Sequence, residues 1–222
     1  METQSEAYLK AVAQQLACPE GDHGIKTGAL MNVNNIGMTH TAISAMNLTS
    51  GQSVLEIGPG NASHVEFLLG QSTNIRYSGV DISETMIQEA RRINAANVES
   101  NQVSFIQTDG EVLPFENQQF DHIFTVNTIY FWESPQAYLK EIKRVLKPSG
   151  MFTLSFADQR FMEKLPFTKY GFRLYLENDV KALLINAGLN PVNTVLKTEE
   201  ITSNSGQLVN RDYYTISSIN FK

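Results

Sequence analysis

The sequence predicts an α/β fold, in which a doubly wound, mainly parallel sheet has helices on both faces. From residue 53 onward, short apolar runs alternate with segments of helical periodicity, which is typical of βαβ units. Glycines follow the first apolar run directly, as they do where a strand turns into a helix beside a ligand. The 222 residues, 42% hydrophobic and 18% charged, fit a globular protein of one large domain or two small ones.

The first 50 residues differ from the rest and predict a helical cap at 1–50, ahead of a main domain at 51–222. Residues 2–16 place apolar side chains on one helical face, and residues 38–46 indicate a second helix. Between them, residues 18–35 are rich in Gly, Asn and Asp and have no clear period. We expect a long irregular segment there.

In the main domain, apolar runs and turn residues define each element in order. Ser83 is the predicted N-cap of a helix whose apolar face includes Met86, and Gly188 is expected to close the last helix. The predicted helices start at 65, 84, 136 and 178. The predicted strands are 53–58, 77–82, 103–108, 121–126, 151–156, 192–198 and 212–219. In such a sheet, ligands bind beyond the carboxyl ends of the strands.

Charge and cysteine content exclude some classes of protein. Lys and Arg number 17 and Asp and Glu 23, so the net charge is −6. This disfavours a large electrostatic contact with nucleic acid or anionic membrane. The one cysteine, Cys18, cannot form an intramolecular disulfide. No apolar run reaches membrane-spanning length and no secretory signal is evident, so we expect a cytoplasmic protein and no membrane span.

The loop after the first strand reads Glu56-Ile57-Gly58-Pro59-Gly60-Asn61-Ala62. A dinucleotide fingerprint would have its third glycine at Ser63. The carboxylate of Glu56 would repel a pyrophosphate, whereas it suits a positively charged ligand group such as an amine or a sulfonium. The loop therefore argues against a nicotinamide-dependent oxidoreductase.

Acidic residues also end the next two strands. Asp81 could accept both hydroxyls of a ribose, and Asp109 could accept from an exocyclic amine. Each also has a local alternative, Asp81 as a helix cap and Asp109 as a turn residue before Gly110. Acids at three successive strand ends behind a glycine loop favour a ligand site.

Together these motifs resemble the class I S-adenosylmethionine-dependent methyltransferases, over about residues 53–157. The branch with ubiquinone/menaquinone C-methyltransferases and many small-molecule enzymes is the most similar. The motifs are Glu56-x-Gly58-x-Gly60-x-Ala62, Asp81-x-Ser83-x-x-Met86, Asp109-Gly110-Glu111 and Glu141-Ile142-x-Arg144-Val145-Leu146-Lys147-Pro148-x-Gly150. The resemblance implies a Rossmann-like sheet of seven strands, the last one antiparallel. It also implies S-adenosylmethionine as cofactor and S-adenosylhomocysteine as product.

By this resemblance Glu56 faces the cofactor's amino group, Asp81 the ribose, Asp109 the adenine edge, and Asn127 the methyl group. The implied cofactor contacts are Glu56, Gly58, Pro59, Gly60, Asn61, Ala62, Asp81, Ile82, Met86, Asp109, Gly110, Glu111 and Asn127. The segment Met31-Asn32-x-x-Asn35 resembles a lid of some bacterial members. No metal is expected.

The sequence departs from many relatives after the fourth strand, where a His pair is replaced by Thr128-Ile129-Tyr130-Phe131-Trp132. No general base is evident, and His40 and Tyr130 are the weak candidates. A base is needed only when the acceptor starts protonated.

Aromatic residues give the clue to the acceptor. We expect Tyr130, Trp132, Phe161, Tyr170 and Tyr175 to line its pocket, the last three from an insert at about 158–175. They suit a flat or apolar small molecule, although they could instead form the core of the insert. The alternatives are an RNA or protein methyltransferase and a non-catalytic S-adenosylmethionine-binding protein. The acceptor atom and the oligomeric state stay open.

Overall fold

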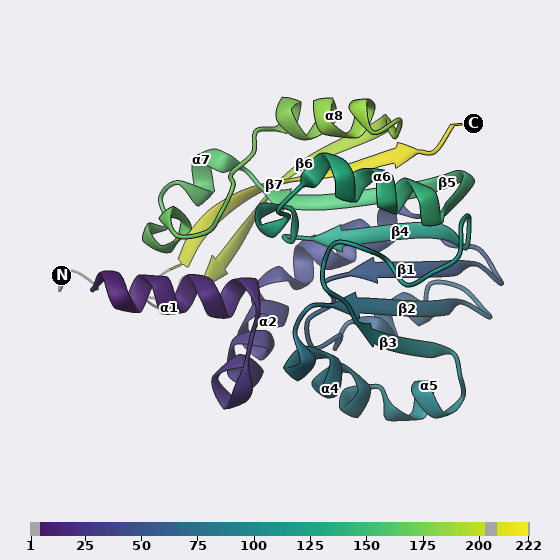
Figure 1. Cartoon of the computed structure of the whole chain (residues 1–222), viewed down its shortest axis with the longest axis horizontal. Helices are drawn as coiled ribbons and strands as arrows, with labels where there is room; N and C mark the ends of the chain where they lie inside the picture. The colour runs from purple at the N-terminus through teal and green to yellow at the C-terminus, as the bar shows by residue number, and fades with distance from the viewer. Residues whose placement is uncertain (1–4, 203–207, 222) are drawn as a thin grey trace.

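A computed structural model describes residues 5–202 and 208–221 and contains one seven-stranded sheet (Figure 1). The strand order is β3-β2-β1-β4-β5-β7-β6. The strands are β1 Ser53–Ile57, β2 Arg76–Asp81, β3 Val103–Gln107, β4 Phe120–Val126, β5 Leu146–Ala157, β6 Asn190–Thr202 and β7 Leu208–Ile219. The first five pair in parallel, and β7 is antiparallel to both of its neighbours. This confirms the predicted doubly wound sheet with its last strand reversed.

Helices cover both faces of the sheet, and neighbouring residues of β1 show the two layers. Val54 packs in one apolar cluster and Leu55 in the other. The first cluster receives side chains from α2 (Gly21–Ala45), α3 (Val65–Leu69) and α4 (Glu84–Ile93). The second receives them from α6 (Pro135–Val145) and α8 (Glu177–Asn186). The alternation follows from the period of two in a strand, which turns successive side chains to opposite faces.

The predicted helix signals in the main domain are confirmed. The Ser83 hydroxyl accepts a hydrogen bond from the Met86 N–H and so caps α4. Gly188 adopts φ +76° just after α8. A further short helix, α5 (Ala95–Glu99), follows α4. Strand β5 begins at Leu146, earlier than predicted, and pairs there with Phe120.

The predicted irregular segment at 18–35 is wrong. α1 spans Glu6–Ala17, and α2 follows almost at once, running without a break through residues 21–45. The glycines lower helix propensity, but they let the helix pack closely. A Cβ on Gly28 would lie 2.5 Å from the Met86 sulfur, and one on Gly24 would lie 2.6 Å from the Pro19 carbonyl carbon. Tertiary packing has therefore overridden local preference.

The insert at 158–175 contains two short helices, α7 (Gln159–Met162) and the 3-10 helix η2 (Pro166–Lys169). Another 3-10 helix, η1 (Ile129–Phe131), follows β4. In Figure 1, α1 lies beside the insert at one end of the sheet, and α1 and η2 are in contact. Among the described helices, none is both long and apolar enough to cross a membrane.

Candidate active site

A pocket of about 280 Å³ lies at the carboxyl ends of β1, β2, β3 and β4, under α2. All of the predicted cofactor residues except Ala62 line it: Glu56, Gly58, Pro59, Gly60, Asn61, Asp81, Ile82, Met86, Asp109, Gly110, Glu111 and Asn127. Ala62 is fully buried behind the glycine loop. The structure therefore brings together one site from four strand ends that are far apart in sequence.

The glycine loop folds tightly over the end of β1. Gly58 and Gly60 have φ values of +70° and +57°, where a side chain is strained. A Cβ on Gly58 would also collide with the Thr128 methyl group from the loop after β4. The loop is held by Asp81, whose Oδ2 accepts a hydrogen bond from the Gly60 N–H at 3.1 Å.

Glu56 is buried at the end of β1 and lines the pocket. Its Oε2 accepts hydrogen bonds from the Tyr77 hydroxyl at 2.5 Å and from His64 Nε2 at 2.7 Å. Burial, and then the Glu56 carboxylate, raise the pKa of Tyr77, so that its hydroxyl stays a donor. Neither partner of Glu56 could be recognised from the sequence, because they come from β2 and from the residue before α3 and show no local spacing.

Asp81 lies both at the start of α4 and at the pocket. Its Oδ1 accepts a hydrogen bond from the Ser83 N–H at 2.9 Å, at the start of α4, while its carboxylate lines the pocket. Burial raises the pKa of Asp81 to about 6, and the hydrogen bonds from the Ser83 and Gly60 N–H groups offset part of that rise.

Asp109 is exposed at the end of β3 and also lines the pocket. Its Oδ1 accepts hydrogen bonds from the backbone N–H groups of Glu111 at 2.8 Å and Val112 at 3.1 Å. These bonds lower the pKa of Asp109. Oδ1 therefore stabilises the turn before Gly110, whereas Oδ2 has no hydrogen-bond partner among the described residues.

One face of α2 forms the wall of the pocket opposite the strands. Its lining residues lie on successive turns of the helix and comprise a glycine, a methionine, two asparagines and a threonine: Gly28, Met31, Asn32, Asn35 and Thr39. The expected lid segment 31–35 is thus part of a helix. The helical spacing of these residues was the available signal, but the glycines and asparagines around them obscured it.

Asn127 follows β4 with φ +59° and lines the pocket, but its side chain is occupied by the protein. Its Oδ1 accepts from the Tyr130 hydroxyl at 3.0 Å and from the Ala157 N–H at 3.2 Å. Its Nδ2 donates to Asn35 Oδ1 at 3.1 Å and to Met38 Sδ at 3.4 Å. An amide has four such positions, so a ligand would contact the Asn127 backbone rather than its amide.

Neither candidate base lines the pocket. His40 stacks on Phe67 with ring centroids 3.8 Å apart, and burial lowers its pKa. Tyr130 is buried, and its hydroxyl accepts from the Ala157 N–H at 2.6 Å. Burial raises the pKa of Tyr130. Packing therefore holds both side chains outside the pocket lining.

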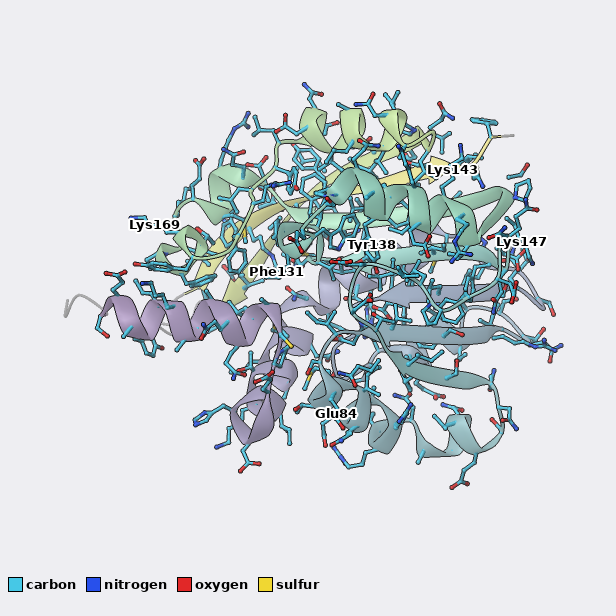
Figure 2. The ribbon with its side chains drawn as sticks, viewed as in Figure 1. Glu84, Phe131, Tyr138, Lys143, Lys147 and Lys169 are labelled. Carbon is cyan, nitrogen blue, oxygen red and sulfur yellow. The ribbon has the colours of Figure 1, made fainter. Side chains whose placement is uncertain are left out.

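Trp132 is the one member of the predicted aromatic set that lines the pocket. Phe131 and Tyr138 line it as well, although they are not among the five residues expected there; both are labelled in Figure 2. Tyr130, Phe161 and Tyr175 pack in the apolar cluster under α6 and α8. Tyr170 lies against Lys10 of α1, 5.5 Å from its ammonium. Tyr130, Phe161 and Tyr175 are therefore core residues, whereas Tyr170 is half-buried and belongs to neither the core nor this pocket.

The lining fits S-adenosylmethionine better than a dinucleotide. Among the described lining residues there is no Lys or Arg, whereas carboxylates occur at the ends of β1, β2 and β3. Such a site would hold the sulfonium and amino groups and would repel a pyrophosphate. Ile82 and Met86 offer apolar surface beside Asp81, where a nucleoside base can pack.

Comparisons with known proteins agree with this geometry. Residues 55–154 match the family model described as "Methyltransferase domain". That segment is similar in sequence to this methyltransferase family, and the fold around it is one that solved structures described as methyltransferases share. The resemblance stated from the motifs is thereby confirmed.

Curated relatives are similar over a little more than half of the chain. A Bacillus subtilis (strain 168) protein described as the uncharacterized methyltransferase YdaC is 29% identical over 123 residues, which are 55% of this chain and 66% of that protein. The fatty-acid O-methyltransferase of Mycolicibacterium smegmatis is 29% identical over 132 residues, 59% of this chain and 46% of that enzyme. This chain spans about half the length of most of these relatives.

Solved structures share the fold. One is the complex between the Haloferax volcanii Trm112 methyltransferase activator and a putative methyltransferase. A chain of that complex matches with a TM-score of 0.73 and 18% identity, and the match covers 88% of this chain and 93% of the other. A putative methyltransferase from Bacillus halodurans matches with a TM-score of 0.66 and 16% identity, covering 82% of this chain and 98% of the other. At such identities the likeness shows the fold alone.

Proposed function

We propose that this protein is an S-adenosylmethionine-dependent methyltransferase that acts on a small molecule. The observation that carries the proposal is the set of buried or bonded carboxylates, Glu56, Asp81 and Asp109, at successive strand ends behind the glycine loop. Bound S-adenosylmethionine would supply an electrophilic methyl group on a positively charged sulfur.

The chain's own residues would bind and orient. Glu56 would accept from the amino group, and Asp81 would accept from the ribose hydroxyls, since its two oxygens each bind only one backbone N–H. α2 would cover the pocket and exclude water. Holding both reactants in line supplies about 7–11 kcal/mol of barrier reduction in favourable cases. Neither His40 nor Tyr130 lines the pocket, so neither would take a proton from an acceptor there.

Four observations support a small acceptor rather than RNA or protein. The net charge is −6, and no Lys or Arg lines the described pocket. The printed names of relatives include fatty-acid and phthiotriol/phenolphthiotriol dimycocerosates methyltransferases, whose acceptors are small or lipid molecules. Trp132 and Phe131 at the pocket favour an apolar or flat acceptor. A cytoplasmic location is part of this proposal.

The test is thermal unfolding with S-adenosylmethionine, S-adenosylhomocysteine or NAD, each in excess. A ligand that binds is present at about 100 times its dissociation constant. Binding at that excess stabilises the fold by about 2.7 kcal/mol, a rise of roughly 5–10 °C in the unfolding temperature. We expect the rise with both sulfur ligands and none with NAD. A rise with NAD alone would overturn the proposal. Turnover across a panel of acceptors then separates an enzyme from a binding protein that has lost catalysis.

A further inference from the structure

Arg211 is a buried cation on β7, outside the matched segment 55–154, and only 5% of it is exposed. Its guanidinium donates to Glu199 Oε1 on β6 at 2.5 Å, to the Asn34 carbonyl at 2.6 Å and to Asn35 Oδ1 at 2.9 Å. A buried charge needs such partners to offset its desolvation. Arg211 thus joins the β6–β7 hairpin to the middle of α2.

These contacts fix the orientation of the Asn35 amide. Its Oδ1 accepts from both Arg211 and Asn127, so the carbonyl side is fully used. The Nδ2 group has to point the other way, and Asn35 is one of the residues that line the pocket. A flip of the amide would bring its NH2 group against two donors.

The position of Asn35 identifies what this N–H group can meet. Asn35 is bonded to Asn127 at the end of β4, the strand that pairs with β1, which carries Glu56. The amino-acid end of S-adenosylmethionine has an amino group and a carboxylate. The pocket offers Glu56 to the first and, within the described lining, no Lys or Arg to the second. The carboxylate therefore needs neutral donors.

We propose that Asn35 donates this hydrogen bond to the cofactor carboxylate and that Arg211 is the positioning residue that holds Asn35 ready to do so. The inference rests on the proposed function. Arg211 does not line the pocket itself, so it acts through the Asn35 amide.

Calorimetric binding of two probes tests the inference without knowledge of the acceptor. S-adenosylhomocysteine has the amino-acid end, and 5′-methylthioadenosine has the nucleoside and sulfur without it. Asn35→Asp keeps the oxygen that Arg211 and Asn127 bind, but replaces the donor with a repelling oxygen. We expect its affinity for S-adenosylhomocysteine to fall about tenfold or more, and its affinity for 5′-methylthioadenosine to change less than about twofold.

Arg211→Gln should weaken S-adenosylhomocysteine binding in the same selective way, and Arg211→Lys, which keeps the buried charge, should restore part of it. The matched control is Lys197→Gln. Lys197 also joins the hairpin to α2, by donating to Thr41 Oγ1 at 3.1 Å, but it has no contact with Asn35 among the described hydrogen bonds. We expect this control to bind both probes normally.

Any other outcome contradicts either the inference about Asn35 and Arg211 or the proposed function. Equal losses for both probes, or equal losses in Lys197→Gln, would mean that Arg211 merely anchors α2. Normal binding by a folded Asn35→Asp would also overturn the inference, and Arg211→Lys decides the matter if Arg211→Gln does not fold. Failure of the unmodified protein to bind either probe would instead contradict the proposed function.

Discussion

At the scale of single residues, Asp81 makes ligand binding depend on pH. The pKa of this carboxyl is raised to about 6 by burial, with the charge of Glu56 adding to the rise and the N–H groups of Gly60, Ser83 and Ile82 opposing it. The ionised form accepts hydroxyl hydrogens, whereas the protonated form loses an acceptor. We therefore expect S-adenosylhomocysteine affinity to fall towards tenfold per pH unit below pH 6.

Calorimetry between pH 5 and 8 checks this expectation. Asp81→Asn is the control, and its binding should be weak and should lack this pH dependence. A wild-type affinity that is constant from pH 8 to 5 would show that Asp81 does not bind the ligand in its ionised form.

The effect of Asp81 on the stability of the folded protein should have the opposite pH dependence to its effect on ligand affinity. Because the folded pKa of Asp81 lies above the ordinary value of 3.8, the folded state holds the proton more tightly. Its contribution to the free energy of unfolding is present below about pH 4 and is lost as the pH rises to about 6. Between pH 4.5 and 7, Asp81→Asn should gain about 2 kcal/mol relative to the unmodified protein. Urea unfolding at the two pH values measures this, and a constant difference would contradict it.

Glu56 gives a second prediction at this scale. Glu56→Gln preserves the shape of the side chain but removes the charge that would face an amino group. We expect S-adenosylhomocysteine to bind at least about tenfold more weakly, since hydrogen bonds to charged groups contribute about 1.5–3 kcal/mol. 5′-methylthioadenosine has no amino group, so its dissociation constant should change little. A parallel loss for both ligands would indicate that the glycine loop has moved instead.

Three of the predicted cofactor residues that line the pocket share one property. Glu56, Asp81 and Asp109 each end an apolar run, so a linear pattern already places them at one edge of a parallel sheet. His64 and Asn35 have no such marker, because their roles depend on contacts with residues 8 and 92 positions away. His40 and Tyr130 were chosen for their chemistry alone, and packing decided their positions.

At the scale of elements, α2 shows why local propensity failed. Its glycines and asparagines disfavour a helix, but the same residues provide close contacts and a polar wall. The strands were predictable because burial on both faces requires continuous apolar runs. The aromatic insert was harder, because apolar rings suit a pocket and a core equally well.

Gly37 tests this account of α2. In an open helix interior, Gly→Ala stabilises by up to about 1 kcal/mol. Here a Cβ on Gly37 would meet the carboxylate of Glu199, which is held by Arg211. We therefore expect Gly37→Ala to destabilise the protein by about 1–3 kcal/mol in urea unfolding.

A double-mutant cycle provides the control. Gly37→Ala should cost less in a Glu199→Ala background, because the colliding carboxylate is then absent. Equal costs in both backgrounds would show that the contact between α2 and β6 does not limit this position.

At the scale of the whole molecule, the cap and the main domain share one core. Ala42, Ile43 and Met46, all within the predicted 1–50 cap, pack with Val54 of β1. The matched segment 55–154 supplies the strand ends, whereas α2 supplies the wall that faces them and is itself bonded to Arg211 of the β6–β7 hairpin. Those outer parts lie beyond the matched segment, and we expect them to set what this member binds.

This arrangement predicts how the molecule responds to a ligand. Any opening of α2 that removes Gly28, Asn35 or Thr39 from the pocket should be incompatible with binding. At 100 times its dissociation constant, S-adenosylhomocysteine should therefore slow such openings about 100-fold. Hydrogen exchange should show this protection for amides between residues 28 and 39. Helix α8 contributes no lining residue within the described pocket, so amides there that exchange by local opening should keep their rates. Protection of α8 alone, or of neither helix while binding is saturated, would mean that α2 does not close over the ligand.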